Sequence, residues 1–246
     1  MSRFFVKDTN IHSEYIDITG EDVSHIKKVL RLRLGDNITV CDSKGQDYNA
    51  RIEKIEDDFI RTFIINTKKC ETEPPVEVTI FQGIPKSDKM DLIIQKCVEL
   101  GIHKIVPVLT EHTVVRLETN RDIDNKVTRW QRISMEAAKQ SNRGIIPEVG
   151  FPVTFDKALE KTCEFDLSII PYEKENSIKL RNCLTGRSID KISFYIGPEG
   201  GFSEKEIEKA RAKGIKPVTL GPRILRTETA GIAVLAIILF QLGDIG

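Results

Sequence analysis

Two glycine-rich turns late in the chain hold the residues whose types and spacing could perform chemistry. They are IGPEGGFS, from Ile196 to Ser203, and LGPRILRTETA, from Leu220 to Ala230. Each turn follows a predicted strand and opens a predicted helix, where glycine lets backbone N–H groups face a ligand without a Cβ in the way. Glycines can also serve only to make tight turns. Two such turns that end at the same sheet edge favour a shared ligand pocket.

The second turn also carries three charged side chains, Arg223, Arg226 and Glu228. Arg226 enters the last predicted helix and can offer a permanently charged fork of donors to an oxygen that gains negative charge during a reaction. Arg223 is the other cation of the turn, unless it is a solvated surface arginine. Glu228 could accept a proton, orient Arg226 or favour the N-terminus of the helix. This turn is therefore the expected catalytic segment.

The elements that would position these turns follow Pro74-Pro75. Short apolar runs, typical of strands buried in a parallel sheet, lie at 76–81, 104–109, 166–171, 191–197 and 217–221. Apolar residues at helical spacing predict helices over 88–100, 124–141, 203–213 and 228–242. Strands that alternate with helices predict an α/β domain with a parallel sheet over residues 74–246.

Residues 1–73 have a different hydrophobic pattern, in which short apolar runs alternate with polar neighbours. Strands are predicted over RFFV, EYIDI, NITVCD, DYNARIEKI and FIRTFIINT. One helical segment interrupts them, at about Gly20 to Leu32. This pattern predicts a small β-barrel or sandwich as a separate N-terminal domain.

Charge, cysteine spacing and the distribution of apolar residues limit the cofactors, partners and location that we expect. Lys+Arg and Asp+Glu each number 37, so the net charge of zero gives no bulk argument for a nucleic acid or a membrane. The five cysteines form no CxxC pair and no zinc-type cluster, so we expect no metal. The start lacks the pattern of a secretory signal, and the apolar stretch from Ala230 to Leu242 is too short to span a bilayer. We therefore expect a cytoplasmic protein without a membrane segment.

The last predicted helix is apolar almost all round, so it must be buried on more than one side. A homodimer interface would bury it, and the core of a monomer would do so equally well.

A resemblance to a known family rests on GPEGGFS and LGPRILRTETA together with MEAAKQSNR and QKCVELGI upstream. These segments resemble the small-subunit (16S) ribosomal RNA uridine-N3 methyltransferases of the SPOUT superfamily, and His25-x-x-x-Val29-Leu30-Arg31 resembles the PUA-like RNA-binding domain of that family. The resemblance implies a C-terminal α/β domain with a deep trefoil knot. It also implies S-adenosylmethionine as the cofactor, a homodimer, and 16S ribosomal RNA or the small ribosomal subunit as the partner.

The resemblance gives expected roles to the residues of the two turns. Arg226, with Glu228 and Arg223, is expected to act on the uracil, whose N3 is a poor nucleophile until its proton is lost. The residues expected to bind the cofactor are Pro107, Gly197, Glu199, Gly200, Gly201, Leu220, Gly221, Ile224, Leu225 and Ala230. Glu199 could bind the ribose or the methionine moiety, or it could only cap a helix.

RNA contact is expected from a local basic cluster and from the polar end of the helix predicted over 124–141. The residues concerned are Arg3, His25, Lys27, Arg31, Arg33, Gln140 and Arg143. Contacts to phosphate of this kind set register rather than sequence. As charges alone, the same side chains could form an ordinary solvated face.

Two alternatives stay open in the sequence. One is a SPOUT methyltransferase with another target, such as transfer RNA or a ribose 2′-hydroxyl. The other is a non-catalytic RNA-binding protein of ribosome assembly that has kept the fold, although the intact run Arg226-Thr227-Glu228 disfavours it.

Overall fold

The computed structural model describes residues 3–115, 117, 119–186 and 188–245. The chain forms two compact units. One comprises Met1–Glu73 together with Ala138–Ile146, and the other comprises Pro74–Ala137 together with Pro147–Gly246. Each unit is described by itself below.

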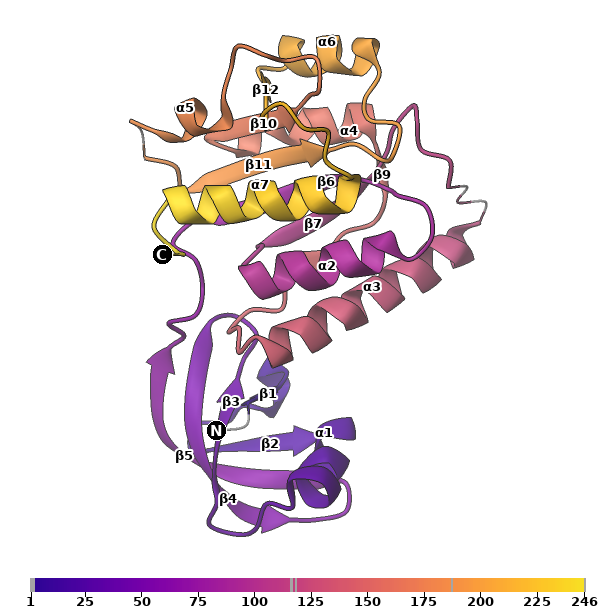
Figure 1. Ribbon diagram of the computed structural model, residues 1–246. Helices are drawn as coiled ribbons and strands as arrows, with labels where there is room; N and C mark the ends of the chain where they lie inside the picture. Colours follow the sequence, from indigo (N-terminus) through magenta and orange to yellow (C-terminus); the bar gives the residue numbers. More distant parts are fainter. Residues whose placement is uncertain (1–2, 116, 118, 187, 246) are drawn as a thin grey trace. The chain divides into compact units, whose positions relative to one another are not determined.

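The first unit is built on a sheet of strand order β1-β3-β4-β5-β2, in which β1 pairs parallel with β3 and the other pairs are antiparallel. Its strands are β1 (Arg3–Phe5), β2 (Tyr15–Thr19), β3 (Asn37–Cys41), β4 (Gln46–Ile55) and β5 (Phe59–Lys69). The register of β4 with β5 shifts twice, and the two long strands bend, as Figure 1 shows. An apolar core lies within this unit. The predicted small β domain is confirmed.

The helix predicted over Gly20 to Leu32 is shorter than expected. It consists of α1 (Glu21–Ser24) and a π-helical turn over His25–Leu30. It ends at Arg31, whose φ of 53° lies in the left-handed region that stops a helix. Val23 and Ile26 are its buried residues, so one narrow stripe holds it on the sheet.

The segment Ala138–Ile146 packs with the first unit, whereas the sequence predicts that it belongs to the second domain. The reason is a set of specific polar contacts. The Gly45 N–H donates to the carbonyl of Gly144 over 3.1 Å, and the Glu73 carboxylate accepts from the Gly144 N–H over 2.8 Å. The chain therefore enters the second unit at Pro74, returns at Ala138 and leaves again at Pro147.

The second unit is a parallel α/β sheet of strand order β12-β10-β11-β6-β7-β8, with β9 paired to β7. Its strands are β6 (Glu77–Gly83), β7 (Lys104–Leu109), β8 (Glu148–Val149), β9 (Val153–Thr154), β10 (Leu167–Pro171), β11 (Lys191–Ile196) and β12 (Lys216–Val218). The principal strands coincide with the predicted apolar runs, and the predicted α/β fold with a parallel sheet is confirmed.

Helices cover both faces of this sheet (Figure 1). They are α2 (Lys89–Leu100), α3 (Asn120–Gln140), α4 (Phe155–Glu160), α5 (Leu180–Leu184), α6 (Glu204–Ala212) and α7 (Thr227–Gln241). The predicted capping box forms at the start of α6, between Ser203 and Glu206. The short helices α4 and α5 were not predicted. Among the described helices, none combines the length and apolarity that a membrane crossing requires.

The last segment of the chain takes an unusual return path. β12 forms one edge of the sheet, yet α7 packs against β6, β11 and α2 near its middle. Residues 219–226 must therefore cross the carboxyl ends of the neighbouring strands to reach the start of α7.

Candidate functional site

A cavity of about 520 Å³ lies in the second unit, where β10, β11 and β12 end. Its walls are the turn after β10, the turn IGPEGGFS after β11 and the turn LGPRILRTETA that leads into α7. The volume lies within the range of about 300–1,000 Å³ that is usual for sites of small organic ligands. The carboxyl ends of parallel strands are also where α/β proteins bind ligands.

Most of the predicted cofactor residues line this cavity, as do both predicted arginines of the last turn. They are Gly197, Glu199, Gly200, Gly201, Leu220, Gly221, Arg223, Ile224, Leu225, Arg226 and Ala230. The structure thus brings together two turns that are separated in the sequence by α6. Lining residues that the sequence analysis missed include Lys89, Tyr172, Glu173, Thr219 and Thr227.

Pro107 and Glu228 stand apart from the other predicted residues, because neither belongs to the described lining of the cavity. Pro107 is buried in β7 opposite Gln82 of β6, and β6 separates β7 from β11. Glu228 lies beside Lys89, with 3.9 Å between its Oε2 and the lysine Nζ. That Oε2 atom is buried and has no hydrogen-bond partner among the described residues. The structure thus pairs Glu228 with Lys89 and not with Arg226.

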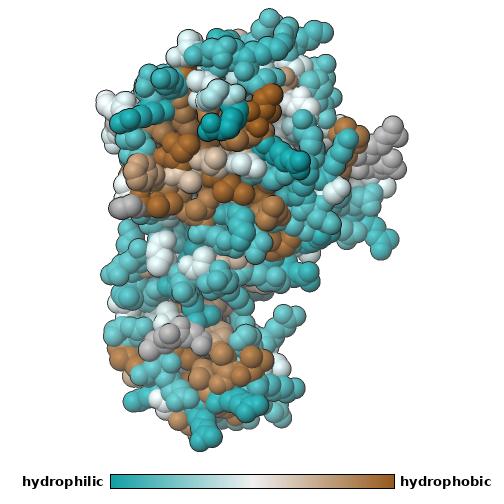
Figure 2. All heavy atoms as spheres, viewed as in Figure 1, coloured by the Kyte–Doolittle hydropathy of each residue, from teal (hydrophilic) through white to brown (hydrophobic). Residues whose placement is uncertain are grey.

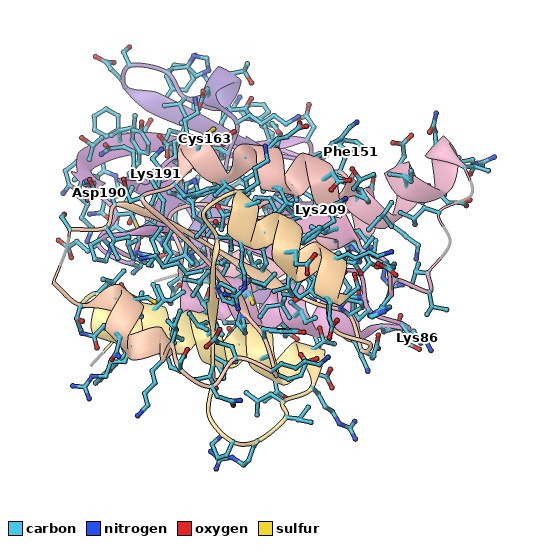
Figure 3. The ribbon with its side chains drawn as sticks, turned by 90° about the horizontal axis from the view of Figure 1, so that it is seen from above. Lys86, Phe151, Cys163, Asp190, Lys191 and Lys209 are labelled. Carbon is cyan, nitrogen blue, oxygen red and sulfur yellow. The ribbon has the colours of Figure 1, made fainter. Side chains whose placement is uncertain are left out.

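Lys89 also fixes the turn after β11. Its Nζ donates to Oε1 of Glu199 over 2.8 Å, and the backbone N–H of Lys86 donates to the same carboxylate. Burial raises the pKa of Glu199, but these hydrogen bonds outweigh it and hold the pKa below its usual value. Lys86, labelled in Figure 3, keeps its own side chain exposed. Glu199 is therefore held as a carboxylate against the start of α2.

The third wall, which contains Tyr172 and Glu173, is anchored by a buried carboxylate next to it. Glu175 accepts hydrogen bonds from the hydroxyl and N–H of Ser177 and from the N–H of Ile178, and its other oxygen lies 3.0 Å from Nη2 of Arg211 on α6. These donors, with the Ser177 hydroxyl first, hold the pKa of Glu175 at about 2. The turn after β10 is thereby tied to α6.

The start of α7 is locked to the floor of the cavity by Thr227. The Thr227 hydroxyl donates to the carbonyl of Gly197 over 2.6 Å and accepts from Nε2 of Gln82 over 2.9 Å. Gly197 itself must be glycine, because a Cβ there would lie 2.8 Å from the carbonyl carbon of Gly201. The two glycine-rich turns and β6 are thus joined by one buried hydroxyl group.

Replacement of Thr227 with valine keeps the shape of the side chain and removes this hydroxyl. The Gly197 carbonyl then loses its donor and the Gln82 amide loses one acceptor. We expect the free energy of unfolding to fall by about 1–3 kcal/mol, the cost of leaving buried polar groups unpaired. Urea denaturation measures the change, with Thr229→Val, at an exposed position of the same helical turn, as the matched control. Equal stability of the two variants would contradict the assignment.

Arg223 and Arg226 are both exposed and line the cavity. Neither forms an ion pair with a described carboxylate. Arg226 precedes the first residue of α7 and has an extended backbone, with φ of −67° and ψ of 154°. Two guanidinium groups are therefore free to meet a ligand at the mouth of the cavity. The described His, Cys, Asp and Glu side chains form no group of three or more suited to a metal ion.

The residues predicted to contact RNA divide into two sets within the first unit. His25, Arg31, Arg33 and Gln140 are exposed, while Lys27 is half-buried and lies 2.9 Å from Asp57. Arg3 and Arg143 are side chains of the interior, with only 8% and 4% of their side-chain surface exposed. Arg3 pairs with Asp47 and Arg143 pairs with Glu73, so their charges serve the packing of this unit.

Fold and cavity place the chain among the α/β enzymes that bind a small ligand at the carboxyl ends of a parallel sheet. A family model described as an RNA methyltransferase domain matches residues 72–239, and one described as an RNA methyltransferase PUA domain matches residues 18–65. The chain belongs to this family of RNA methyltransferases.

Individual relatives cover almost the whole chain. The ribosomal RNA small subunit methyltransferase E of Bacillus subtilis is 34% identical over 98% of this chain and 97% of its own length. The crystal structure of the Neisseria gonorrhoeae methyltransferase of the same name, bound to S-adenosyl methionine, is 35% identical and superposes with a TM-score of 0.85 over 97% of this chain and 96% of its own. A Legionella pneumophila methyltransferase in complex with the same cofactor is 28% identical, with a TM-score of 0.83 over 96% of each chain. The SPOUT-type fold with a PUA-like domain is thereby confirmed.

Proposed function

We propose that this chain is an S-adenosylmethionine-dependent methyltransferase that methylates N3 of a uridine in 16S ribosomal RNA, in the cytoplasm. The observation that carries the proposal is the strand-end cavity with two unpaired arginines at its mouth. Relatives also support the proposal, because proteins named ribosomal RNA small subunit methyltransferase E align over nearly the whole chain.

The residues of the cavity fit this cofactor. Leu220, Ile224 and Leu225 provide apolar surface for an adenine ring, and the backbone of the two turns provides amide and carbonyl groups for its polar edge. Glu173 lies across the cavity near Gly201 and can bind hydroxyl or cationic groups of a ligand. When bound, S-adenosylmethionine supplies a methyl group on a positively charged sulfur.

The protein's part in the chemistry is to favour the deprotonated uracil and to aim its N3. Loss of the N3 proton spreads negative charge onto O2 and O4 of the base. The guanidinium of Arg226, with Arg223 beside it in the turn, can donate to these oxygens. Because this charge is larger in the transition state than in the bound ground state, such donors lower the barrier more than they tighten binding. Glu228, whose free oxygen is buried, acts through Lys89 and the start of α7.

We also propose a homodimer that buries the exposed apolar face of α2 and α7. Phe240 of α7 is 66% exposed, and Ile237 of α7 and Leu92 of α2 add to the same kind of surface. Figure 2 shows hydrophobic side chains gathered where α7 lies in Figure 1. A patch of this kind on a soluble chain is typical of an interaction site, and a second copy of the chain would cover it.

RNA is expected to meet the exposed basic end of the first helical segment, where Lys28, Arg31 and Arg33 are exposed together with the apolar side chains of Val29 and Leu34. Arg31→Ala should raise the RNA concentration for half-maximal rate several-fold at low salt, and it should lower the salt dependence of binding by about one phosphate contact. The single-turnover rate at saturating RNA should stay nearly unchanged. Filter binding at several salt concentrations tests this, with Arg51→Ala on β4 as the control. An equal effect of both variants would remove Arg31 from the RNA surface.

The direct test of the function is methylation in vitro. The purified protein is incubated with S-adenosylmethionine and either free 16S ribosomal RNA or small subunits from a strain that lacks the enzyme. Mass spectrometry of nuclease fragments then locates the added methyl group. N3-methyluridine at one position supports the proposal. A methyl group on a ribose or only on added transfer RNA would replace the target, and no transfer with intact cofactor binding would indicate a non-catalytic protein.

A further inference from the structure

Lys89 lines the cavity, and nothing in the sequence marks it for a role there. It occupies the first position of α2, where the positive end of the helix dipole disfavours a cation. The helix dipole therefore gives no reason for a lysine at this position. The lysine lines the cavity and lies between two carboxylates from other elements.

The two carboxylates belong to the two segments on which catalysis depends. Glu199 lies in the middle of the turn after β11, which forms the cofactor wall. Glu228 lies in the first turn of α7, two residues after Arg226. Lys89 Nζ is 2.8 Å from Oε1 of Glu199 and 3.9 Å from Oε2 of Glu228. One ammonium group thus joins three segments of the chain.

The partner atoms have few other ways to satisfy their charge. The Oε2 atom of Glu228 is buried without a hydrogen-bond partner among the described residues, so the Lys89 ammonium is its described counter-charge. Glu199 keeps the N–H of Lys86 as a second donor. All three side chains are at most one-third exposed, which limits screening by water.

We propose that Lys89 is a positioning residue that couples the cofactor turn to the start of α7, and through it to Arg226. This inference rests on the proposed methyl transfer, and it makes two separable claims. Through Glu199, Lys89 sets the affinity for the cofactor. Through Glu228, it sets the orientation of Arg226 and hence the rate at saturation.

Three variants test the proposal. Lys89→Met keeps an unbranched side chain that is one atom shorter and removes the charge, and Lys89→Arg keeps the charge. Lys104→Met is the matched control, because Lys104 is 34% exposed against 32% for Lys89 and has a single ion pair, of 2.7 Å, with Glu148. Lys104 begins β7, at the end of the sheet opposite to the cavity.

The first measurement is the affinity for S-adenosylhomocysteine, the product form of the cofactor, by calorimetry. Lys89→Met is expected to weaken binding on the order of 10-fold, the change that corresponds to loss of one charge-assisted hydrogen bond. Lys89→Arg should recover most of the affinity, and Lys104→Met should match the wild type. In combination with Glu199→Gln, the effect of Lys89→Met should nearly vanish, because both changes break the same contact. Additive effects would overturn the claim about Glu199.

The second measurement is the single-turnover rate with both substrates saturating. Lys89→Met and Glu228→Gln should each lower this rate, and the double variant should be little slower than either. A rate that stays at the wild-type value in Lys89→Met would overturn the claim about Glu228.

The third measurement needs no ligand. Amide hydrogen exchange of residues 199–202 in the free protein should be faster in Lys89→Met than in Lys104→Met, and Lys89→Arg should restore the protection. If the exchange rate of these amides were unchanged in Lys89→Met, the proposal that Lys89 holds the turn after β11 would be wrong. A second outcome is that the wild-type protein binds no S-adenosylhomocysteine and still shows this difference in exchange. In that case the proposed function would be wrong, but Lys89 would still hold the turn after β11.

Discussion

Replacement of Arg226 with alanine is expected to lower the rate of methyl transfer at saturating substrate by about 100-fold or more, by analogy with the loss of one oxyanion donor. Arg226 lines the cavity, is exposed, and has no described carboxylate to neutralise it. Its guanidinium can therefore meet the negative charge that develops on the uracil oxygens. Single-turnover kinetics measure the rate, and calorimetry should find the cofactor affinity nearly unchanged.

Arg226→Lys separates charge from geometry. A lysine supplies a point charge and cannot reproduce the planar fork of donors, so only part of the rate should return. If Arg226→Ala instead weakens RNA binding while the rate at saturation is kept, Arg226 docks the substrate. The catalytic role would then pass to Arg223 or to a side chain of the second copy in the proposed dimer.

Two neighbouring isoleucines of α7 should respond very differently to a charge. Ile238 is fully buried within a single chain, so Ile238→Glu should lower the free energy of unfolding on the order of 4 kcal/mol, because a charge would lie in the core. Ile237 is 42% exposed on the apolar face of α7. Ile237→Glu should leave each chain folded and should separate the proposed dimer.

Chemical denaturation and native mass spectrometry check the two results together. A folded monomer of Ile237→Glu supports the proposed interface. If Ile237→Glu remains a dimer of wild-type affinity, the second copy does not sit on this face of α7. If Ile238→Glu is as stable as the wild type, the packing of α7 against the sheet is wrong.

The sequence predicts the strands of the parallel sheet well, because burial on both faces requires continuous apolar runs. It also places the two glycine-rich turns correctly, since a turn that follows a parallel strand must lie at its carboxyl end. What periodicity cannot supply is the order of the strands. Pro107 lies inside β7, a strand that ends at the same edge, but β6 lies between β7 and β11, so Pro107 does not line the cavity.

The sequence also does not reveal which side chains of a given type are buried and which are exposed. Thr227 is buried and joins two turns, while Thr229 is exposed. Arg143 looks like the basic end of a surface helix, yet it is buried against Glu73. Lys89 resembles any lysine near the start of a helix, because its partner Glu199 is distant in the chain and adjacent only in the fold. In each case tertiary packing decides the role.

The membership of residues 138–146 in the first unit has a consequence for the order of folding. The chain emerges from the ribosome from its N-terminus, so the β domain appears long before the segment that completes it. Until then the Glu73 carboxylate lacks Arg143 and the N–H groups of Gly144 and Ile145 that it binds in the finished protein. Residues 1–73 cut out alone would lack the same partners. The β domain can reach its final form only after the chain has passed through β6, α2, β7 and α3, so a nascent chain completes its first unit only when part of the second unit has already been made.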